Sequence, residues 1–315
     1  MNIVFFGSSE FAVSSLKALA IAGHNILAVV TQPDRKMGRH LRLEATAVKK
    51  NALGLNLKIL QPENTNLPET LNFLKELNAD LFIVVSYGQI LSKELLALPK
   101  IFAINAHASI LPKYRGAAPI NWAIIRGEKV TGVSIIKITE KIDAGPVILE
   151  REIGICNEDT SITLREKLSR LAADLFLEAA RVIEKDDYKL ILQNEQDVIF
   201  APKLKKEDGL IDWKSSSADI YNLIRGSLAW PGAFTYYKGK MLKIHKAKVS
   251  SRVCKFASSN PGEIMEVSKE GIVVFTGKDN IIIEELQIEG KRKMNAEEFV
   301  AGHKISIGEM LGVKK

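Results

Sequence analysis

The sequence predicts an α/β protein: a Rossmann-like, doubly wound, mostly parallel sheet, followed by a smaller antiparallel β-barrel domain. In the first half, apolar runs of strand length alternate with amphipathic helical stretches. In the second half, short strands follow one another with turn residues between them. The chain of 315 residues is long enough for two cores. We therefore expect one domain over 1–188, a linker over 189–205 and a second domain over 206–315.

The apolar pattern places the elements of the first half. The expected strands are 2–6, 25–31, 57–60, 81–85, 101–104 and 132–138. The expected helices are 12–22, 67–77, 117–126 and a long one that ends near Glu184. Thr163 with Glu166 predicts a capping box where that long helix begins. The run Leu81–Val85 has no polar residue, which is typical of a central parallel strand buried on both faces.

The second half has the pattern of an antiparallel domain. Its expected strands are 234–237, 241–248, 262–267, 271–275 and 280–288. Near the end, Asn295 and Glu298 have the spacing of a capped helix. The acidic and polar stretch before this half predicts the linker.

Composition restricts the class of protein. Apolar and charged fractions are 46% and 26%, which is ordinary for a globular protein, and the longest apolar runs are shorter than a membrane span. We expect a cytosolic protein. Cys156 and Cys254 are the only cysteines and are far apart, so neither a disulfide framework nor a metal site is predicted.

The positive charge is concentrated in the second half. Residues 1–199 carry 24 basic and 23 acidic residues, whereas residues 200–315 carry 20 and 14. A basic domain joined to a neutral one is typical of a protein that binds a polyanion with one domain and performs chemistry with the other. A lysine-rich surface that serves only solubility is the open alternative.

The most informative stretch follows the apolar run 101–104. Asn105 and His107 are two residues apart at the end of this expected strand, so their side chains point to the same face. An amide donor beside an imidazole can hold a developing oxyanion and move a proton, as acyl transfer requires. Asp143 follows another expected strand and precedes Gly145. Each residue alone would be an ordinary turn or surface residue, and their combination indicates a catalytic site.

The first strand-to-helix turn argues against a dinucleotide site. It holds a single glycine, Gly7, where the dinucleotide fingerprint needs three. A NAD-dependent enzyme is therefore not predicted, in spite of the Rossmann-like layout.

Several segments resemble the folate-dependent formyltransferases in the same order along nearly the whole chain. The segments that carry the resemblance are 5–13, 31–35, 86–91, 105–112, 115–119, 201–213 and 230–233. The block Asn105-Ala-His107-Ala-Ser109-Ile-Leu-Pro112 is shared by all branches of this family. The segments of the second half resemble only the branch that acts on a charged tRNA.

The resemblance implies that 10-formyltetrahydrofolate donates its formyl group to the α-amine of methionine on initiator tRNA. It implies an OB-like fold for the β-barrel domain. It also implies catalytic roles for Asn105, His107 and Asp143, direct transfer without a covalent enzyme intermediate, and no metal. The residues expected to bind the folate are Tyr87, Gly88, Gln89, Ile90 and Leu91, together with Ser109, Ile110, Leu111 and Pro112. The residues expected to bind tRNA are Arg35, Lys36, Arg39 and Arg42, in a basic loop over 32–43. A monomer is expected.

Three alternatives remain open at this point. A related formyltransferase could act on an amino-sugar nucleotide, although the basic loop disfavours it; the second half of the chain argues against an enzyme that acts on glycinamide ribonucleotide. A hydrolase of 10-formyltetrahydrofolate would use the same three polar residues with water as nucleophile. A non-enzymatic RNA-binding protein would explain the basic second half, but it would leave the Asn105–His107 pair without a role.

Overall fold

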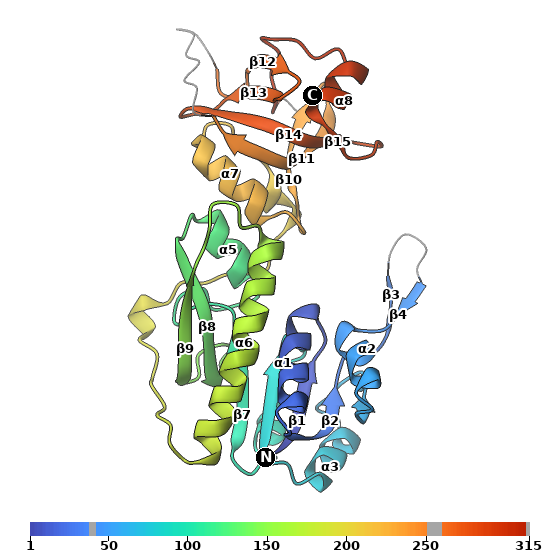
Figure 1. Ribbon diagram of the computed structural model, residues 1–315, viewed down its shortest axis with the longest axis vertical. Coiled ribbons are helices and arrows are strands. Elements are labelled where there is room, and N and C mark those ends of the chain that lie inside the picture. The colour runs from blue at the N-terminus through green and yellow to red at the C-terminus, as the bar shows by residue number, and fades with distance from the viewer. Residues whose placement is uncertain (38–41, 251–259, 313–315) are drawn as a thin grey trace. The chain divides into compact units, whose positions relative to one another are not determined.

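The computed structural model describes residues 1–37, 42–250 and 260–312. Among them the chain divides into two compact units (Figure 1). The first unit comprises residues 1–119, 130–154 and 165–202, and the second comprises residues 120–129, 155–164 and 203–315. The predicted fold class is confirmed, because a mostly parallel α/β sheet forms the first unit and an antiparallel sheet forms the second.

The first unit is built on a seven-stranded sheet with the order β5-β2-β1-β6-β7-β8-β9. The first five strands in this order run parallel, and β8 and β9 extend the sheet in antiparallel fashion. The strands are β1 (Asn2–Gly7), β2 (Asn25–Val30), β5 (Ile59–Leu60), β6 (Leu81–Val85), β7 (Phe102–His107), β8 (Val130–Lys137) and β9 (Val147–Gly154). Open sheets of this kind bind ligands beyond the carboxyl ends of their parallel strands.

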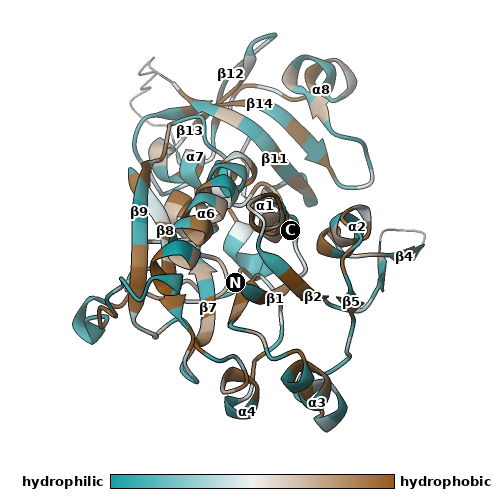
Figure 2. Cartoon of the chain, turned by 60° about the horizontal axis from the view of Figure 1, so that its bottom comes forward, coloured by the Kyte–Doolittle hydropathy of each residue, from teal (hydrophilic) through white to brown (hydrophobic). Residues whose placement is uncertain are grey.

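The central strands are apolar because both of their faces are buried. All five residues of β6 are buried, as its sequence predicts. Phe6 of β1 packs on Phe82 of β6, with ring centroids 5.2 Å apart. Burying a phenylalanine side chain of this kind stabilises the fold by about 1.5–3 kcal/mol. In Figure 2, β1 and β2 carry apolar stretches, whereas α3 and α6 each show an apolar and a polar side.

The helices over 10–21, 68–76, 119–125 and 161–184 lie close to the positions that the apolar pattern predicts, whereas those over 47–54, 93–96 and 217–226 were not predicted. The helices are α1 (Glu10–Ile21), α2 (Ala47–Gly54), α3 (Pro68–Glu76), α4 (Lys93–Leu96), α5 (Pro119–Ile125), α6 (Ser161–Glu184), α7 (Ser217–Gly226) and α8 (Ala296–Gly302). The capping box predicted from Thr163 and Glu166 is wrong. The hydroxyl of Thr160 accepts from the N–H of Thr163, and the hydroxyl of Thr163 accepts from the N–H of Thr160. Two threonines therefore cap α6, which begins at Ser161.

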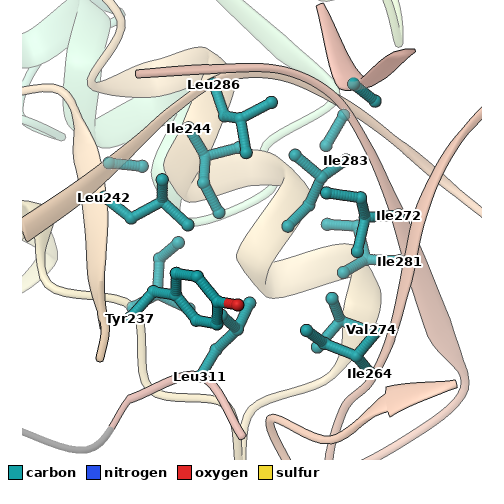
Figure 3. Close-up of a cluster of buried hydrophobic side chains, with 14 of the residues drawn as sticks. Tyr237, Leu242, Ile244, Ile264, Ile272, Val274, Ile281, Ile283, Leu286 and Leu311 are labelled. Atoms are coloured by element: carbon teal, nitrogen blue, oxygen red, sulfur yellow. The ribbon is translucent and has the colours of Figure 1, made fainter. Parts of the chain in front are cut away.

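The second unit holds a six-stranded antiparallel sheet. Its strands are β10 (Ala233–Tyr237), β11 (Lys240–Val249), β12 (Ile264–Ser268), β13 (Gly271–Phe275), β14 (Asn280–Ile288) and β15 (Met294–Asn295). The apolar side chains of these strands form one buried cluster, which Figure 3 shows with Leu242, Ile244, Ile283 and Leu286 among its members. The capping box of Asn295 and Glu298 at the start of α8 is confirmed.

Some elements were not predicted. A two-stranded antiparallel ribbon, β3 (Arg35–Met37) with β4 (Arg42–Glu44), forms within the basic loop. Its residues are mostly polar and exposed, so the sequence has no apolar alternation to indicate a strand. Within the described parts of the chain, no helix has the length and apolar character needed to cross a membrane.

Candidate functional site

A cavity of about 330 Å³ opens in the first unit beside the ends of β6 and β7. Three residues from neighbouring strands form its floor: Val84 of β6, Asn105 of β7 and Ile136 of β8. They lie side by side, because Asn105 pairs with Val84 on one side and with Ile136 on the other. The loop 86–91 forms one wall, and the loop 138–143 forms another. The volume is within the usual range for small-molecule sites.

Asn105 lines this cavity from a position near the carboxyl end of β7. The residue is half-buried, and within the described chain the structure gives its side-chain amide no protein hydrogen-bond partner. Most half-buried amides bind to the backbone or to other side chains. The Asn105 amide is therefore available to donate to an oxygen atom of a bound molecule.

His107 and Asp143 lie close together, as the sequence predicts. Nδ1 of His107 is 3.5 Å from Oδ2 of Asp143. The other ring nitrogen, Nε2, is 2.8 Å from the carbonyl oxygen of Tyr114. A carbonyl oxygen only accepts, so Nε2 carries a hydrogen and the lone pair of the neutral ring lies on Nδ1, toward Asp143. His107 is only 5% exposed, and Asp143 rather than the imidazole lines the cavity.

The Asp143 carboxylate is held at the cavity wall by the backbone of the loop after β7. Its Oδ2 accepts a hydrogen bond of 3.0 Å from the N–H of Gly116. Gly116 has φ +120°, and a Cβ atom there would lie 2.7 Å from the carbonyl oxygen of Ala201. Asp143 itself has φ 51°, in the left-handed region that aspartate tolerates better than most residues. Glycine is thus required where the loop approaches the carboxylate.

Loop 86–91 lines the cavity, and two of its side chains are hydrogen-bonded to Thr65. The Tyr87 hydroxyl is hydrogen-bonded to the Thr65 hydroxyl, and Gln89 accepts from the N–H of Thr65 at 2.8 Å. Burial raises the pKa of Tyr87, and the bond to Thr65 opposes that rise. The side chains of Tyr87 and Gln89 are therefore held by Thr65. This supports the prediction that the backbone of the loop makes the contacts with a bound molecule.

The segment Ser109–Pro112 supports the site from behind. Ser109 is fully buried and its hydroxyl donates to the carbonyl of Lys113 at 2.6 Å. Ser134 links the segment to β8, accepting from the N–H of Leu111 and donating to the carbonyl of Ser109. The residues that line the cavity do not include Ser109, Ile110, Leu111 or Pro112. Their expected contact with folate stays a prediction, and the described bonds give them a structural role.

Three of the four predicted tRNA-binding residues lie on the β3–β4 ribbon. Arg35, Lys36 and Arg42 are exposed there, and Arg39 is outside the described residues. The guanidinium of Arg35 forms a 2.7 Å ion pair with Glu63. Lys36 and Arg42, the other basic residues described on the ribbon, have no ion-pair partner among the described residues.

Three supporting residues of the site were missed by sequence reasoning. Ser8, in the first strand-to-helix turn, donates to the carbonyl of Tyr87 at 3.0 Å, and Gln32 donates to the same oxygen at 3.3 Å. Gln193 donates to the carbonyls of Asp143 and Gly145. Ser8 and Gln32 lie in segments that carry the family resemblance, which could have indicated them. Gln193 lies in the expected linker, and no sequence pattern marked it.

Comparison with known proteins gives the class. Residues 1–180 match the family model of formyl transferases, and residues 203–304 match that of the formyl transferase C-terminal domain.

The structure of WlaRD, a sugar 3N-formyl transferase, has the same fold, with a TM-score of 0.68, 20% identity, and 93% of this chain and 99% of that chain covered. HypX from Aquifex aeolicus in complex with tetrahydrofolic acid gives a TM-score of 0.64 at 17% identity, covering 98% of this chain and 48% of HypX. This chain spans about half the length of HypX. The fold and the matched domains define a formyltransferase.

Relatives of higher identity give the particular family. Methionyl-tRNA formyltransferase of Caldanaerobacter subterraneus subsp. tengcongensis is 46% identical over 312 residues, with 99% of this chain and all of the relative covered. The same enzyme of Thermodesulfovibrio yellowstonii is 46% identical over 309 residues, with 98% and 97% covered. The chain belongs to the methionyl-tRNA formyltransferase family. The resemblance inferred from the sequence is confirmed.

Proposed function

We propose that Asn105, His107 and Asp143 catalyse transfer of the formyl group of 10-formyltetrahydrofolate to the α-amino group of methionine on initiator Met-tRNA. The family supplies the reaction, which is formylation of Met-tRNA with the folate as co-substrate. The observation that carries the residue assignment is that Asn105 and Asp143 line one cavity, with His107 3.5 Å behind the carboxylate.

Asn105 stabilises negative charge on the formyl oxygen. As the amine nitrogen bonds to the formyl carbon, the carbonyl oxygen gains negative charge, which a fixed N–H donor stabilises more in the transition state than in the ground state. Asn105 lies on a central strand, and its side-chain amide makes no hydrogen bond to other described residues of the protein. It therefore needs no rearrangement within the protein before it can donate.

Asp143 and His107 move the proton. The attacking amine must lose a proton, and the nitrogen of the folate must gain one as its bond to the formyl carbon breaks. The Asp143 carboxylate reaches the cavity, and the neutral imidazole behind it can accept a proton at Nδ1 while Nε2 stays bound to Tyr114. The pair can thus accept a proton from the amine and return one to the folate nitrogen.

The two walls of the cavity suit the folate. The backbone of loop 86–91 offers N–H and C=O groups to a planar, polar ring system, and Ile90 and Ile142 present exposed apolar side chains at the loops. We assign the folate to this cavity, with Ser109–Pro112 holding the strand end that carries His107.

We assign formyl transfer to residues 1–188 and tRNA binding to the basic residues 206–315 together with the β3–β4 ribbon. The excess of basic residues in 200–315 supports this division, because tRNA phosphates bind lysine and arginine. We further propose that the enzyme acts as a monomer in the cytosol, where charged tRNA and reduced folate meet.

The function is tested with purified protein, 10-formyltetrahydrofolate and methionine-charged tRNA. We expect formylmethionine on initiator tRNA, and much less on elongator tRNA charged with the same amino acid. Release of formate at the same rate without tRNA would indicate a hydrolase. Formylation of a 3-amino-sugar nucleotide but not of Met-tRNA would indicate the sugar branch of the fold.

Neutralising the ribbon should weaken tRNA binding. The double variant Lys36→Gln, Arg42→Gln removes the two exposed cations that have no ion-pair partner in the described chain. We expect a higher KM for Met-tRNA, an unchanged KM for the folate, and a salt dependence whose slope falls by about one for each phosphate that is no longer bound. Steady-state kinetics over a range of salt concentrations measure this. The exposed Lys185→Gln serves as the control, and a rise confined to the folate KM would contradict the assignment.

A further inference from the structure

We infer that Gln193 is a positioning residue for Asp143, and that the segment 191–201 is part of the catalytic apparatus. This inference rests on the proposed role of Asp143. The side-chain amide of Gln193 donates to the carbonyl of Asp143 at 2.9 Å and to the carbonyl of Gly145 at 2.7 Å. It thereby holds the backbone on both sides of Ala144, where the loop 138–146 turns.

The loop needs such support because its backbone is constrained at both residues. Asp143 has φ 51°, a conformation that a non-glycine residue keeps only when its surroundings impose it. Gly145 lies so close to β8 that a Cβ atom there would be 1.8 Å from the carbonyl oxygen of Lys137. Both N–H groups of the Gln193 amide are used on this turn, so the direction of the Asp143 side chain depends on them.

Gln193 is in turn fixed by a buried arginine. Nε of Arg115 donates to Oε1 of Gln193 at 2.9 Å, and the guanidinium also reaches Glu195 at 2.9 Å. Arg115 is 3% exposed, which is rare for an arginine unless its charge is paired. Arg115 and Lys141 both lower the pKa of Glu195, so the carboxylate stays charged. The donors of Arg115 determine which way the Gln193 amide faces: its oxygen points to Arg115 and its nitrogen to the loop.

The same segment also holds the other side of the carboxylate. Arg115 exchanges two backbone hydrogen bonds with it, donating to Ile199 at 2.9 Å and accepting from Ala201 at 2.8 Å. Ala201 also accepts from Ala118 at 3.1 Å. These bonds flank Gly116, whose N–H donates to Asp143. Segment 191–201 therefore fixes both the backbone that carries the carboxylate and the donor that the carboxylate binds.

The test compares Gln193→Glu with the wild-type enzyme. Glutamate keeps the size of the side chain and an acceptor for Arg115, but it loses both N–H donors and places a carboxylate against two carbonyls. A displacement of about 1 Å at a catalytic group can cost about 100-fold in rate, so we expect kcat to fall by about that factor, with a much smaller change in the KM for Met-tRNA. Gln193→Met, which is apolar and similar in size, should lose kcat in the same way. Exposed Lys185→Gln, which lies outside this segment, should behave as wild type.

A double-mutant cycle with Asp143→Ala distinguishes positioning from general damage. If Gln193 acts through Asp143, then Gln193→Glu should leave kcat unchanged once Asp143 is alanine. An equal loss in both backgrounds, or Gln193→Glu and Gln193→Met variants with wild-type kcat, would overturn the inference. Wild-type kcat in Asp143→Ala itself would instead overturn the proposed function. Thermal unfolding midpoints of all variants establish that each protein is folded.

Discussion

Replacing His107 by alanine should lower kcat for formyl transfer by about two to four orders of magnitude, the usual contribution of a general acid or base. The variant removes the imidazole. In the wild-type enzyme, Nδ1 of this ring can take a proton from Asp143 while Nε2 stays bound to the carbonyl of Tyr114. Asp143 remains and still reaches the cavity, so binding of both substrates should change less than turnover. Single-turnover formylation of Met-tRNA with saturating folate measures the chemical step.

Two further variants provide a control and a test of the proton-transfer role of His107. His24 lies outside the cavity lining, at the turn after α1, and His24→Ala should keep wild-type turnover. His107→Gln can retain a donor toward the Tyr114 carbonyl without an ionisable ring, because its amide nitrogen can reach the position of Nε2, so it separates the structural bond from proton transfer. Turnover close to wild type in His107→Gln would show that the imidazole does not move the proton.

Asn105→Ala should lower kcat by about 100- to 1,000-fold, as expected when one donor to a developing oxyanion is removed. The fold should be unaffected, because the described structure gives the Asn105 side chain no hydrogen bond within the protein. Asn105→Asp should be at least as severe, since it exchanges the donor for a negative charge beside the carbonyl oxygen. Rapid-quench kinetics provide kcat, and the folate KM should change little.

The aspartate and alanine variants of Asn105 together test the mechanism. If Asn105 only shaped the cavity, Asn105→Asp would resemble wild type because the two side chains have nearly the same size. Comparable kcat in Asn105→Asp and wild type would therefore rule out the donor role. A defect in the folate KM alone would assign Asn105 to binding and not to the transition state.

Local sequence was sufficient for the strands of the first sheet other than β9, which was not predicted, and for the residues of the site that share a strand. The run Leu81–Val85 is the strand that its composition predicts, and Asn105 and His107 both lie on β7. Apolar periodicity and strand alternation act over a few residues, so they are visible in the sequence. The ribbon β3–β4 and the cap of α6 were not predicted, because polar residues can satisfy the backbone in several ways.

The sequence by itself determined the family, the alternation of strands and helices, and the identity of the three polar residues assigned to catalysis. Only the tertiary structure decided how those residues are held. It placed Asp143 between the cavity and His107, bonded the side chains of Tyr87 and Gln89 to Thr65, and brought Gln193 from the expected linker to the Asp143 loop. The physical reason is distance along the chain: Gln193 and Asp143 are 50 residues apart, and a hydrogen bond between them leaves no periodic pattern in either segment.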